Sequence, residues 1–382
     1  MPTRPEVPCL TDGVVTLRAH TEDDVEPTYE MCSDPVFARW TSVPKPYTRD
    51  DAKRFIRDVI PAGWSDASFR GWAIDAMDVD GAPRFAGNVD VLGAPVSHVG
   101  FGLHPWARGR GVTTRAVRLA ARWAFEAGDV EVLHWLSQVG NVASRRVAWA
   151  CGFTLGGTMP RLLVGRDVVL DAWTGWLLPT DDGTPRTRWL EPTLLPGERV
   201  LLRPMVESDA ARVQEACADE RTGQWLKALG PGYTVDKARE YIASRVVQQS
   251  VGATVAWAVA DPSTDELLAN ISVMGLGDED ASTGEIGYWA HPAARGRGVM
   301  TEACRLVVQH SFTSQSAGGL GLRRLQLAAG VENPASRHVA EQAGFVEYGR
   351  ARAAEPLGDG SYADLIWFDQ LAPDRHREHP DR

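Results

Sequence analysis

Short apolar runs alternate along the chain with longer amphipathic stretches. Runs of β-branched and apolar residues that end at Asp-Gly or Gly-Ala-Pro turns predict strands. In the first half these runs lie at residues 14–18, 71–75, 85–92, 98–103, 131–137 and within 155–177. Apolar positions at helical spacing predict helices at residues 51–60, 112–127 and 144–150. Thr21, which is followed by three acidic residues, predicts the N-cap of a further helix.

The second half has the same succession of patterns. Helical spacing occurs at residues 236–247, 299–314 and 335–343. Strand-like runs occur at residues 254–260, 268–275, 284–290, 322–328 and within the closing segment 346–368. Each half therefore has the predicted order β-α-α-β-β-β-α-β-α-β-β. This order is typical of an α/β fold in which a mixed sheet carries helices on both faces.

Matching residues indicate that the two halves are copies of one domain. Arg108 matches Arg295 at a separation of 187 residues, and Asn141 matches Asn333 at a separation of 192. A separation that grows slowly is expected from a duplication followed by insertions in surface loops. A segment rich in Pro, Gly and charge lies between the halves and predicts a linker. The predicted first domain, second domain and linker are residues 13–178, 198–370 and 179–197.

Composition narrows the classes of function. The chain has 382 residues, a net charge of −10 and 44% apolar residues, which is ordinary for a globular protein and unfavourable for a nucleic-acid partner. Its five cysteines are scattered without any Cys-x-x-Cys spacing, so we expect a reducing compartment and no metal site. No secretory signal and no run of about 20 apolar residues is present. These features predict a soluble cytoplasmic protein without a membrane partner.

The strongest motif is an Arg-Gly-Arg-Gly-Val loop that occurs once in each half. It lies within residues 100–116 and again within 287–303, after a strand-like segment and His-Pro and before a long helix. Glycines permit a tight turn, and a helix N-terminus presents free N–H groups and the positive end of its dipole. Such a loop suits a pyrophosphate group. A solvated Arg-Gly turn or an RNA-binding tract is the alternative, which repetition in two matching contexts disfavours.

These motifs resemble those of the GNAT superfamily of acyl-CoA-dependent N-acyltransferases, in particular its RimJ/RimL-like branch. The family signature Arg/Gln-x-x-Gly-x-Gly/Ala is matched from Arg108 and from Arg295, and it departs only at the last position, Thr113 and Met300. A later Asn-x-x-Ser…Gly-Phe block occurs in both halves. The resemblance implies two tandem GNAT domains that use acetyl-CoA or another acyl-CoA.

The resemblance also assigns cofactor-binding roles. Pyrophosphate binding falls to two loops, namely Arg108, Gly109, Arg110, Gly111, Val112 and Thr113, and Arg295, Gly296, Arg297, Gly298, Val299 and Met300. Contact with the pantetheine arm and polarisation of the thioester carbonyl fall to the strand backbone at Leu103 and Ala290. Hydrogen bonds to the pantetheine fall to Asn141 and Asn333.

Catalytic groups are assigned on the same basis. Glu285 and His98 occupy equivalent places and are candidate general bases, although His98 has an ordinary strand position as its alternative. Ser144 and Ser336 are candidate proton donors to the leaving thiolate, with N-capping of the short helix as the alternative. The family's Tyr acid is replaced by Ala in both halves. We therefore expect both halves to bind acyl-CoA and the second to be the better catalyst.

Further residues are candidates for the acceptor pocket. Trp40 and Trp225 fall on the loop between the first two helices and would contact the substrate, with core packing as the alternative. Asp90, and Asn270 on the equivalent strand, are weaker candidates for contact with an amine.

The predicted function is transfer of an acetyl group to a primary amine of a small molecule or a peptide N-terminus. One alternative is a partly or wholly non-catalytic acyl-CoA-binding regulator. Another is an O-acyltransferase, or a transferase of longer acyl groups, on the same fold. We expect a monomer or a homodimer.

Overall fold

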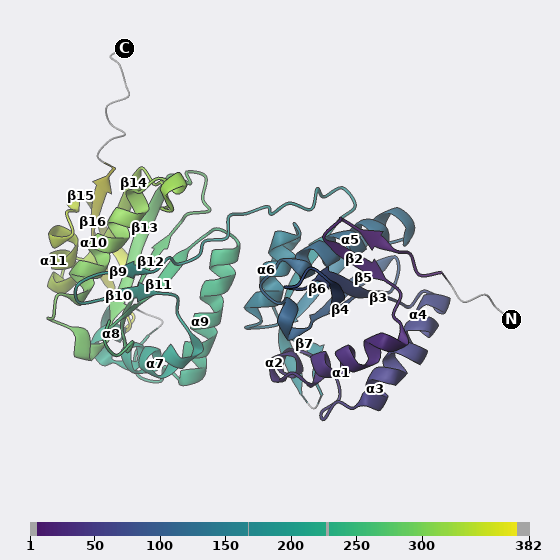
Figure 1. Cartoon of the computed structure of the whole chain (residues 1–382). Coiled ribbons are helices and arrows are strands. Elements are labelled where there is room, and N and C mark those ends of the chain that lie inside the picture. The colour runs from purple at the N-terminus through teal and green to yellow at the C-terminus, as the bar shows by residue number, and fades with distance from the viewer. Residues whose placement is uncertain (1–5, 167, 227–228, 373–382) are drawn as a thin grey trace, which may run out of the picture. The chain divides into compact units, whose positions relative to one another are not determined.

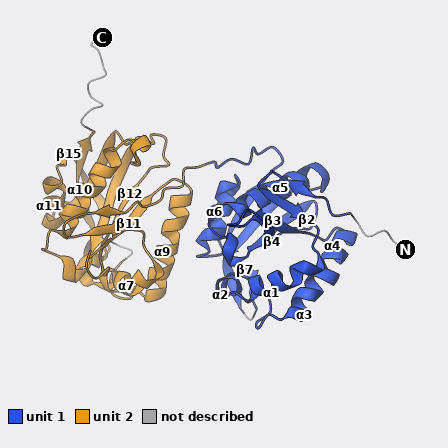
Figure 2. Ribbon diagram, in the orientation of Figure 1, with its two compact units in different colours: residues 1–186 blue, residues 187–382 orange. Residues whose placement is uncertain are grey.

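The computed structural model describes residues 6–166, 168–226 and 229–372 and divides the chain into two compact units. Unit 1 is residues 1–186 and unit 2 is residues 187–382 (Figure 2). Each unit holds one mixed sheet which has eight strands over the described residues, together with helices (Figure 1). The prediction of two α/β domains is confirmed.

Unit 1 follows the predicted order of elements. Its strands are β1 (Leu10–Thr11), β2 (Val15–Arg18), β3 (Phe69–Met77), β4 (Pro83–Leu92), β5 (Val96–Leu103), β6 (Val132–Gln138), β7 (Thr154–Val164) and β8 (Val169–Leu177). Its helices are α1 (Val25–Ser33), α2 (Pro35–Trp40), α3 (Arg49–Arg54), α4 (Ile60–Asp66), α5 (Val112–Ala127) and α6 (Val142–Ala150). The strands lie in the order β1-β2-β3-β4-β5-β6-β8-β7, and among the described strand pairs only β5–β6 is parallel.

Unit 2 repeats this topology. Its strands are β9 (Leu195–Pro196), β10 (Leu201–Arg203), β11 (Val255–Ala260), β12 (Leu267–Met274), β13 (Thr283–Ala290), β14 (Arg324–Gly330), β15 (Val346–Pro356) and β16 (Tyr362–Leu371). Its helices are α7 (Ala210–Ala218), α8 (Glu220–Trp225), α9 (Val235–Ser250), α10 (Val299–Phe312) and α11 (Pro334–Gln342). The parallel pair of this sheet is β13–β14, the counterpart of β5–β6.

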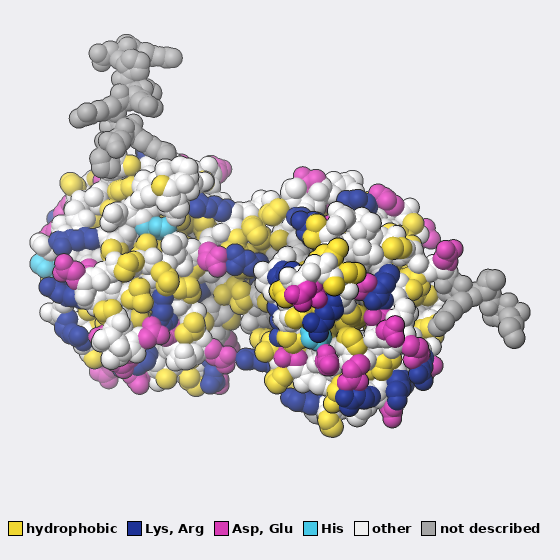
Figure 3. Space-filling model, viewed as in Figure 1, with side chains coloured by type: hydrophobic (Ala, Val, Ile, Leu, Met, Phe, Trp, Pro, Cys, Tyr) yellow, Lys and Arg dark blue, Asp and Glu magenta, His cyan; other side chains and the backbone are white. Residues whose placement is uncertain are grey.

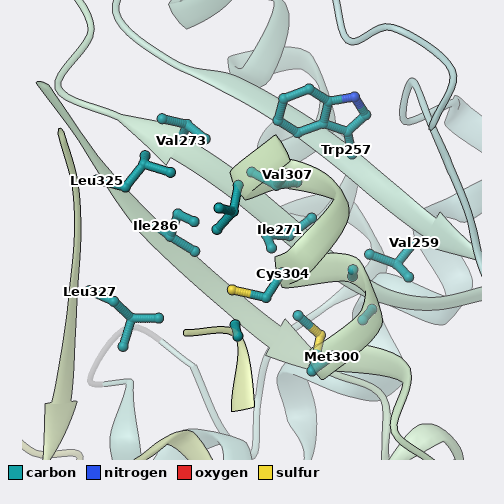
Figure 4. Packing of buried hydrophobic residues seen from close by; sticks show 14 of the residues in the cluster. Trp257, Val259, Ile271, Val273, Ile286, Met300, Cys304, Val307, Leu325 and Leu327 are labelled. Atoms are coloured by element: carbon teal, nitrogen blue, oxygen red, sulfur yellow. The ribbon is translucent and has the colours of Figure 1, made fainter. Parts of the chain in front are cut away.

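The alternation of side chains along each strand separates two apolar layers. In unit 2, Trp257 and Ile271 pack on one face of the sheet against Met300, Cys304 and Val307 of α10 (Figure 4). The opposite face packs against α7 and α9 in a separate cluster. In unit 1, likewise, α5 lies on one side of the sheet and α1 on the other (Figure 1). The sheet of each unit therefore has two covered faces, and a side chain's register decides which one it reaches.

Two predicted boundaries are wrong. The helix predicted at 51–60 begins at Arg49 and continues to Asp66, because a π-turn at Phe55–Val59 precedes Pro61 and carries the helix through it. The predicted linker also contains packed residues. Leu190 is buried in the core of unit 2, and β9 pairs with β10.

Charged side chains of both signs are interspersed on the face of the molecule that Figure 3 shows, in each unit. None of the described helices is long and apolar enough to cross a membrane.

Candidate functional site

In each unit, the two parallel strands separate soon after they meet. In unit 1, β5 and β6 pair only from Val96 with Val132 to His98 with His134. Beyond these residues, β5 stays paired with β4 as far as Leu103, and β6 stays paired with β8 as far as Gln138. In unit 2, β13 and β14 likewise pair over three residues and then diverge. The facing edges of the diverging strands are left with backbone N–H and C=O groups that require partners.

A cleft of about 1620 Å³ lies in unit 1 at this divergence. It is lined by both diverging strand segments, by α1 and α2 and by the glycine loop. The lining includes nine residues predicted for the site: Trp40, Leu103, Arg108, Gly109, Gly111, Val112, Thr113, Asn141 and Ser144. In unit 2 a smaller pocket of about 370 Å³ lies between α8 and the β15–β16 turn, away from the glycine loop.

The glycine loops have the backbone that the sequence predicts. Gly109, Gly111, Gly296 and Gly298 have φ values between +71° and +75°, which favour glycine. A Cβ atom on any of the first three would meet no atom within 4 Å, so the loop surface is open. α5 and α10 begin directly after the loops, so their unpaired N–H groups and positive dipole ends lie there.

The first arginine of each loop binds a carboxylate of its own unit. Arg108 Nη2 lies 2.5 Å from Asp34 Oδ1, and Asp34 also caps α2. Arg295 pairs in the same way with Asp219, the cap of α8. Burial opposes ionisation of Asp34 and Asp219, but the hydrogen bonds from the arginines hold the pKa of each below its usual value. These ion pairs tie each glycine loop to a short helix, α2 in unit 1 and α8 in unit 2.

The second arginine of each loop is exposed. Arg110 Nη2 donates to the carbonyl oxygen of Met77 at 2.9 Å, and its guanidinium lies 5.4 Å from the Trp106 ring centroid. Arg297 Nη1 donates to the carbonyl oxygen of Ala293 at 3.4 Å. These side chains lie on the outer surface of the loops.

The asparagines and serines after β6 and β14 have distinct roles. Asn141 Oδ1 accepts from the N–H of Ser144 at 3.2 Å, and Asn333 Oδ1 accepts from the N–H of Ser336 at 3.1 Å. The asparagines are therefore the N-caps of α6 and α11, and the interpretation of the serines as caps is wrong. Ser144 Oγ accepts from Trp135 Nε1 at 2.9 Å.

Ser336 has a different neighbour in unit 2. Its Oγ lies 2.9 Å from the hydroxyl of Tyr288, which comes from β13. The two serines therefore occupy the same place in the fold but are held by different strands, since Trp135 belongs to β6.

The two predicted bases lie in different surroundings. His98 is exposed, does not line the cleft and lies 5.6 Å from His134 between ring centroids. Burial and His134 both lower the pKa of His98. Glu285 is half-buried, and burial together with Glu355 raises its pKa.

A buried carboxylate, Asp90, lines the cleft of unit 1 and was ranked low by sequence reasoning. Its oxygens accept from Asn88 Nδ2 at 3.2 and 3.4 Å. Burial raises the pKa of Asp90 to about 7, although the hydrogen bond from Asn88 lowers it. The strand register also corrects the expected equivalence. Asp90 pairs with Gly100 as Ser272 pairs with Gly287, so Asn270 corresponds to Asn88 and not to Asp90.

The sequence predicted that Trp40 and Trp225 lie on a loop. This prediction is wrong, because the two residues end the short helices α2 and α8. Trp40 packs near Gly140, where a Cβ would lie 3.6 Å from its ring, and lines the cleft. Trp225 packs in the same way on Gly330, with a Cβ-to-ring distance of 2.9 Å. The described residues contain no group of three His, Cys, Asp or Glu side chains that could hold a metal ion.

The family model described as an acetyltransferase (GNAT) domain matches residues 15–154 and 199–346, once in each unit and over more than half of the chain. The chain belongs to the GNAT acetyltransferase family. This finding confirms the predicted acyltransferase with two tandem domains. The GNAT family uses acyl-CoA as its acyl donor.

Individual relatives match less than half of the chain. The chain is 31% identical to "Putative ribosomal N-acetyltransferase YdaF" of Bacillus subtilis (strain 168) over 178 residues, which are 46% of this chain and 92% of that protein. It is 34% identical to the ribosomal-protein-serine acetyltransferase of Escherichia coli (strain K12) over 107 residues, which are 28% of this chain and 56% of that one. Among solved structures, RimL, a ribosomal L7/L12 alpha-N-protein acetyltransferase in complex with coenzyme A, is 21% identical with a TM-score of 0.41, covering 47% of this chain and 98% of its own.

The raised pKa of Asp90 predicts how stability depends on pH. Because the folded-state pKa of about 7 exceeds the ordinary value of 3.8, the protonated carboxyl favours the folded state at low pH, and this contribution is lost as pH rises to about 7. Asp90→Asn removes the titration. Between pH 4 and pH 7, the free energy of unfolding of the variant should therefore rise relative to that of the wild type by about 1.4 kcal/mol per pH unit.

Denaturant unfolding of both proteins at several pH values measures this difference. Asp80→Asn, at an exposed turn position, is the control. The difference between its free energy of unfolding and that of the wild type should not change with pH. A difference between Asp90→Asn and wild type that is constant with pH would contradict the assignment.

Proposed function

We propose that this chain is an acetyl-CoA-dependent N-acetyltransferase in which a primary amine attacks the thioester directly. The observation that carries the proposal is the position of the strand divergence. In each unit it opens beside a glycine loop with positive φ and a helix N-terminus. A thioester anchored at the loop would extend between the diverging strands, and its acyl group would reach the α1 or α7 face of the sheet.

The coenzyme end of the site would be held mainly by backbone. The N–H groups of residues 109–113 and 296–300 would bind the diphosphate, and Arg110 and Arg297 would add positive charge. Arg108 and Arg295 would act by holding the loops in place through Asp34 and Asp219. Their position supports this role because each guanidinium already has a carboxylate partner.

The pantetheine arm would lie along the free edge of β5 or β13. Leu103 and Ala290 end these strands, and their backbone would bind the arm and polarise the thioester carbonyl. Asn141 and Asn333 use Oδ1 to cap a helix, so Nδ2 would be their donor to the arm. Because the amine itself attacks the thioester, this arrangement requires no covalent enzyme intermediate.

Proton transfers complete the reaction. The amine must lose a proton before attack, and the leaving thiolate gains one. Ser144 and Ser336 lie at the start of α6 and α11, where a hydroxyl could donate to the thiolate. Glu285 stays a predicted base for unit 2, and His98, outside the cleft lining, is a weaker one for unit 1.

Both units would bind the donor, and unit 1 has the stronger case for binding the acceptor. Sequence reasoning favoured the second half because of Glu285. The cleft that joins the glycine loop to α1 and α2 supports acceptor binding by unit 1. The names of the relatives refer to ribosomal acetyltransferases, which supports a peptide N-terminus as acceptor, and a small-molecule amine fits the same chemistry.

Release of free thiol from acetyl-CoA tests the function directly. Purified protein is mixed with a panel of peptides, arylalkylamines, polyamines and amino sugars, and amide products are identified by mass spectrometry. We expect thiol release in equal amount to an N-acetylated product for at least one amine. Tight coenzyme binding without turnover on any amine would instead support the non-catalytic regulator, and ester products would support the O-acyltransferase.

Alanine at the loop glycines should block coenzyme binding one unit at a time. Gly111→Ala and Gly296→Ala each place a methyl group on the open loop surface, so calorimetric titration with coenzyme A should show one site per chain where the wild type shows two. Gly81→Ala is the matched control, because Gly81 has φ +78° and open space in a distant turn and suffers the same strain of about 1–2 kcal/mol. Two sites in both loop variants would contradict the proposal.

A further inference from the structure

Three of the differences between the two units lie close to the cleft of unit 1, on the face of the sheet that carries α1 or α7. Thr28 of α1 replaces Val213 of α7, since the two helices align over their whole length. Asp90 replaces Ser272, by the register of β4 and β12. Unit 1 therefore has a hydroxyl and a carboxylate where unit 2 has a methyl group and a hydroxyl.

The third difference lies on the strand that diverges. Gly102 of β5 replaces Trp289 of β13. Trp289 is buried in the cluster formed with α7 and α9. In unit 1 the aromatic ring comes from α2 instead, because Phe37 packs over Gly102, at 2.4 Å from the place of a Cβ. Both Phe37 and Gly102 line the cleft.

In unit 2 the polar groups of this face satisfy one another. Tyr241 donates to Asn270 Oδ1 at 2.9 Å, and Asn270 Nδ2 donates to the carbonyl oxygen of Trp257 at 2.8 Å. Ser272 Oγ donates to the same Oδ1 at 3.4 Å. The network contains no net charge and needs no ligand.

In unit 1 the corresponding network is incomplete. Phe55 stands in place of Tyr241, so its hydroxyl is missing, and Asn88 donates only to Asp90 among the described contacts. Asp90 forms no ion pair with any lysine or arginine that the structure describes. Thr28 is 1% exposed, lines the cleft, and its Oγ1 has no hydrogen-bond partner among the described residues. The buried carboxylate and the buried hydroxyl could therefore both form hydrogen bonds with a ligand in the cleft.

The carboxylate lies at the point where the strands divide. Asp90 pairs with Gly100, two residues beyond the last parallel pair of β5. A Cβ on Gly71 or Gly100 would lie 3.0 or 3.4 Å from its oxygens, so glycines make room for it on both neighbouring strands. The aromatic rings of Phe37, Trp40, Phe55 and Phe69 are part of the cleft lining.

We propose that unit 1 accepts a primary amine with an aromatic or apolar body, whose ammonium group binds Asp90 and Thr28. This inference rests on the proposed acetyl transfer. The ammonium gives one proton to the Asp90 carboxylate, and the neutral nitrogen attacks the thioester carbonyl carbon. The C–N bond forms, the C–S bond breaks, and the second proton of the nitrogen passes to the leaving thiolate. The products are the amide, coenzyme A and one proton, which Asp90 returns to solvent.

The other titratable groups near Asp90 are not suited to accept the proton of the ammonium group. Cys32 of α1 is a titratable neighbour of Asp90, and Tyr47 before α3 in turn contacts Cys32. Burial raises the pKa of Cys32 to about 12 and that of Tyr47 well above its usual value, so both are neutral near pH 7. Five cationic residues line the cleft. Arg108 is paired with Asp34, Arg166 donates to backbone carbonyls, and Arg39 lies over the Trp40 ring. Lys45 and Arg146 are exposed.

Binding of 2-phenylethylamine and of its neutral analogue 2-phenylethanol to the full chain tests the inference. The wild type should bind the amine about 10- to 100-fold more tightly than the alcohol, which is the worth of a charged hydrogen bond. Asp90→Asn and Asp90→Ser, the residue of unit 2, should abolish this preference, and Thr28→Val should reduce it. Ser272→Ala, at the same place in unit 2, is the matched control and should keep it.

Turnover adds a second readout. The kcat/KM for 2-phenylethylamine should rise with pH through the titration of Asp90, and Asp90→Asn should lower it about 10- to 100-fold and remove this rise. An amine preference that survives in Asp90→Asn, or that is absent from the wild type, overturns the inference. If peptides are acetylated while these variants keep full activity, the proposed acetyltransferase stands and the assignment of Asp90 fails. If no amine releases thiol, the proposed function itself fails.

Discussion

Everything in the site depends on how briefly the two parallel strands pair. β5 and β6 share three residue pairs, and each is then held by its outer neighbour, β4 or β8. The outer hydrogen bonds keep the diverging segments straight, so the inner edges cannot collapse onto one another. They remain a row of backbone donors and acceptors inside a folded domain. The same arrangement in unit 2 makes the divergence a property of the fold, independent of the side chains around it.

A second constraint joins the two sides of this opening. Arg108 connects the glycine loop to Asp34, and Arg295 connects the second loop to Asp219. Each aspartate also caps the short helix that carries Trp40 or Trp225. The loop that would hold the coenzyme and the helix beside the acceptor cleft are therefore parts of one ionic unit. Loss of a single arginine would disturb both.

The sequence alone predicts the elements well because apolar periodicity and glycine turns are local signals. The bounds of α5 are those predicted, and the loop glycines have the predicted positive φ. Contacts between segments that are distant in the sequence could not be predicted from these local signals. The partner of Arg108 is 74 residues away, and nothing local marks it. Asp90 was matched to Asn270 although the register makes Ser272 its counterpart. This error of two residues keeps the same face of the sheet, so the alternation of side chains could not reveal it.

The duplication shows how one backbone can hold two kinds of surface. In unit 2 the polar groups near Trp289 hydrogen-bond to one another. In unit 1 the Asp90 carboxylate and the Thr28 hydroxyl line a cleft instead. The shared part is the loop and the strand edges, and the acceptor side has diverged. The two units thus share the loop and the strand edges that we propose bind the thioester, and they differ in the side chains of the proposed acceptor side.

Hydrogen exchange of the backbone amides, measured with and without coenzyme A, tests the central claim most directly. Both glycine loops, at residues 108–113 and 295–300, should become protected together with the free edges of β5 and β13. Unchanged exchange at these amides, with saturating ligand, would contradict the account.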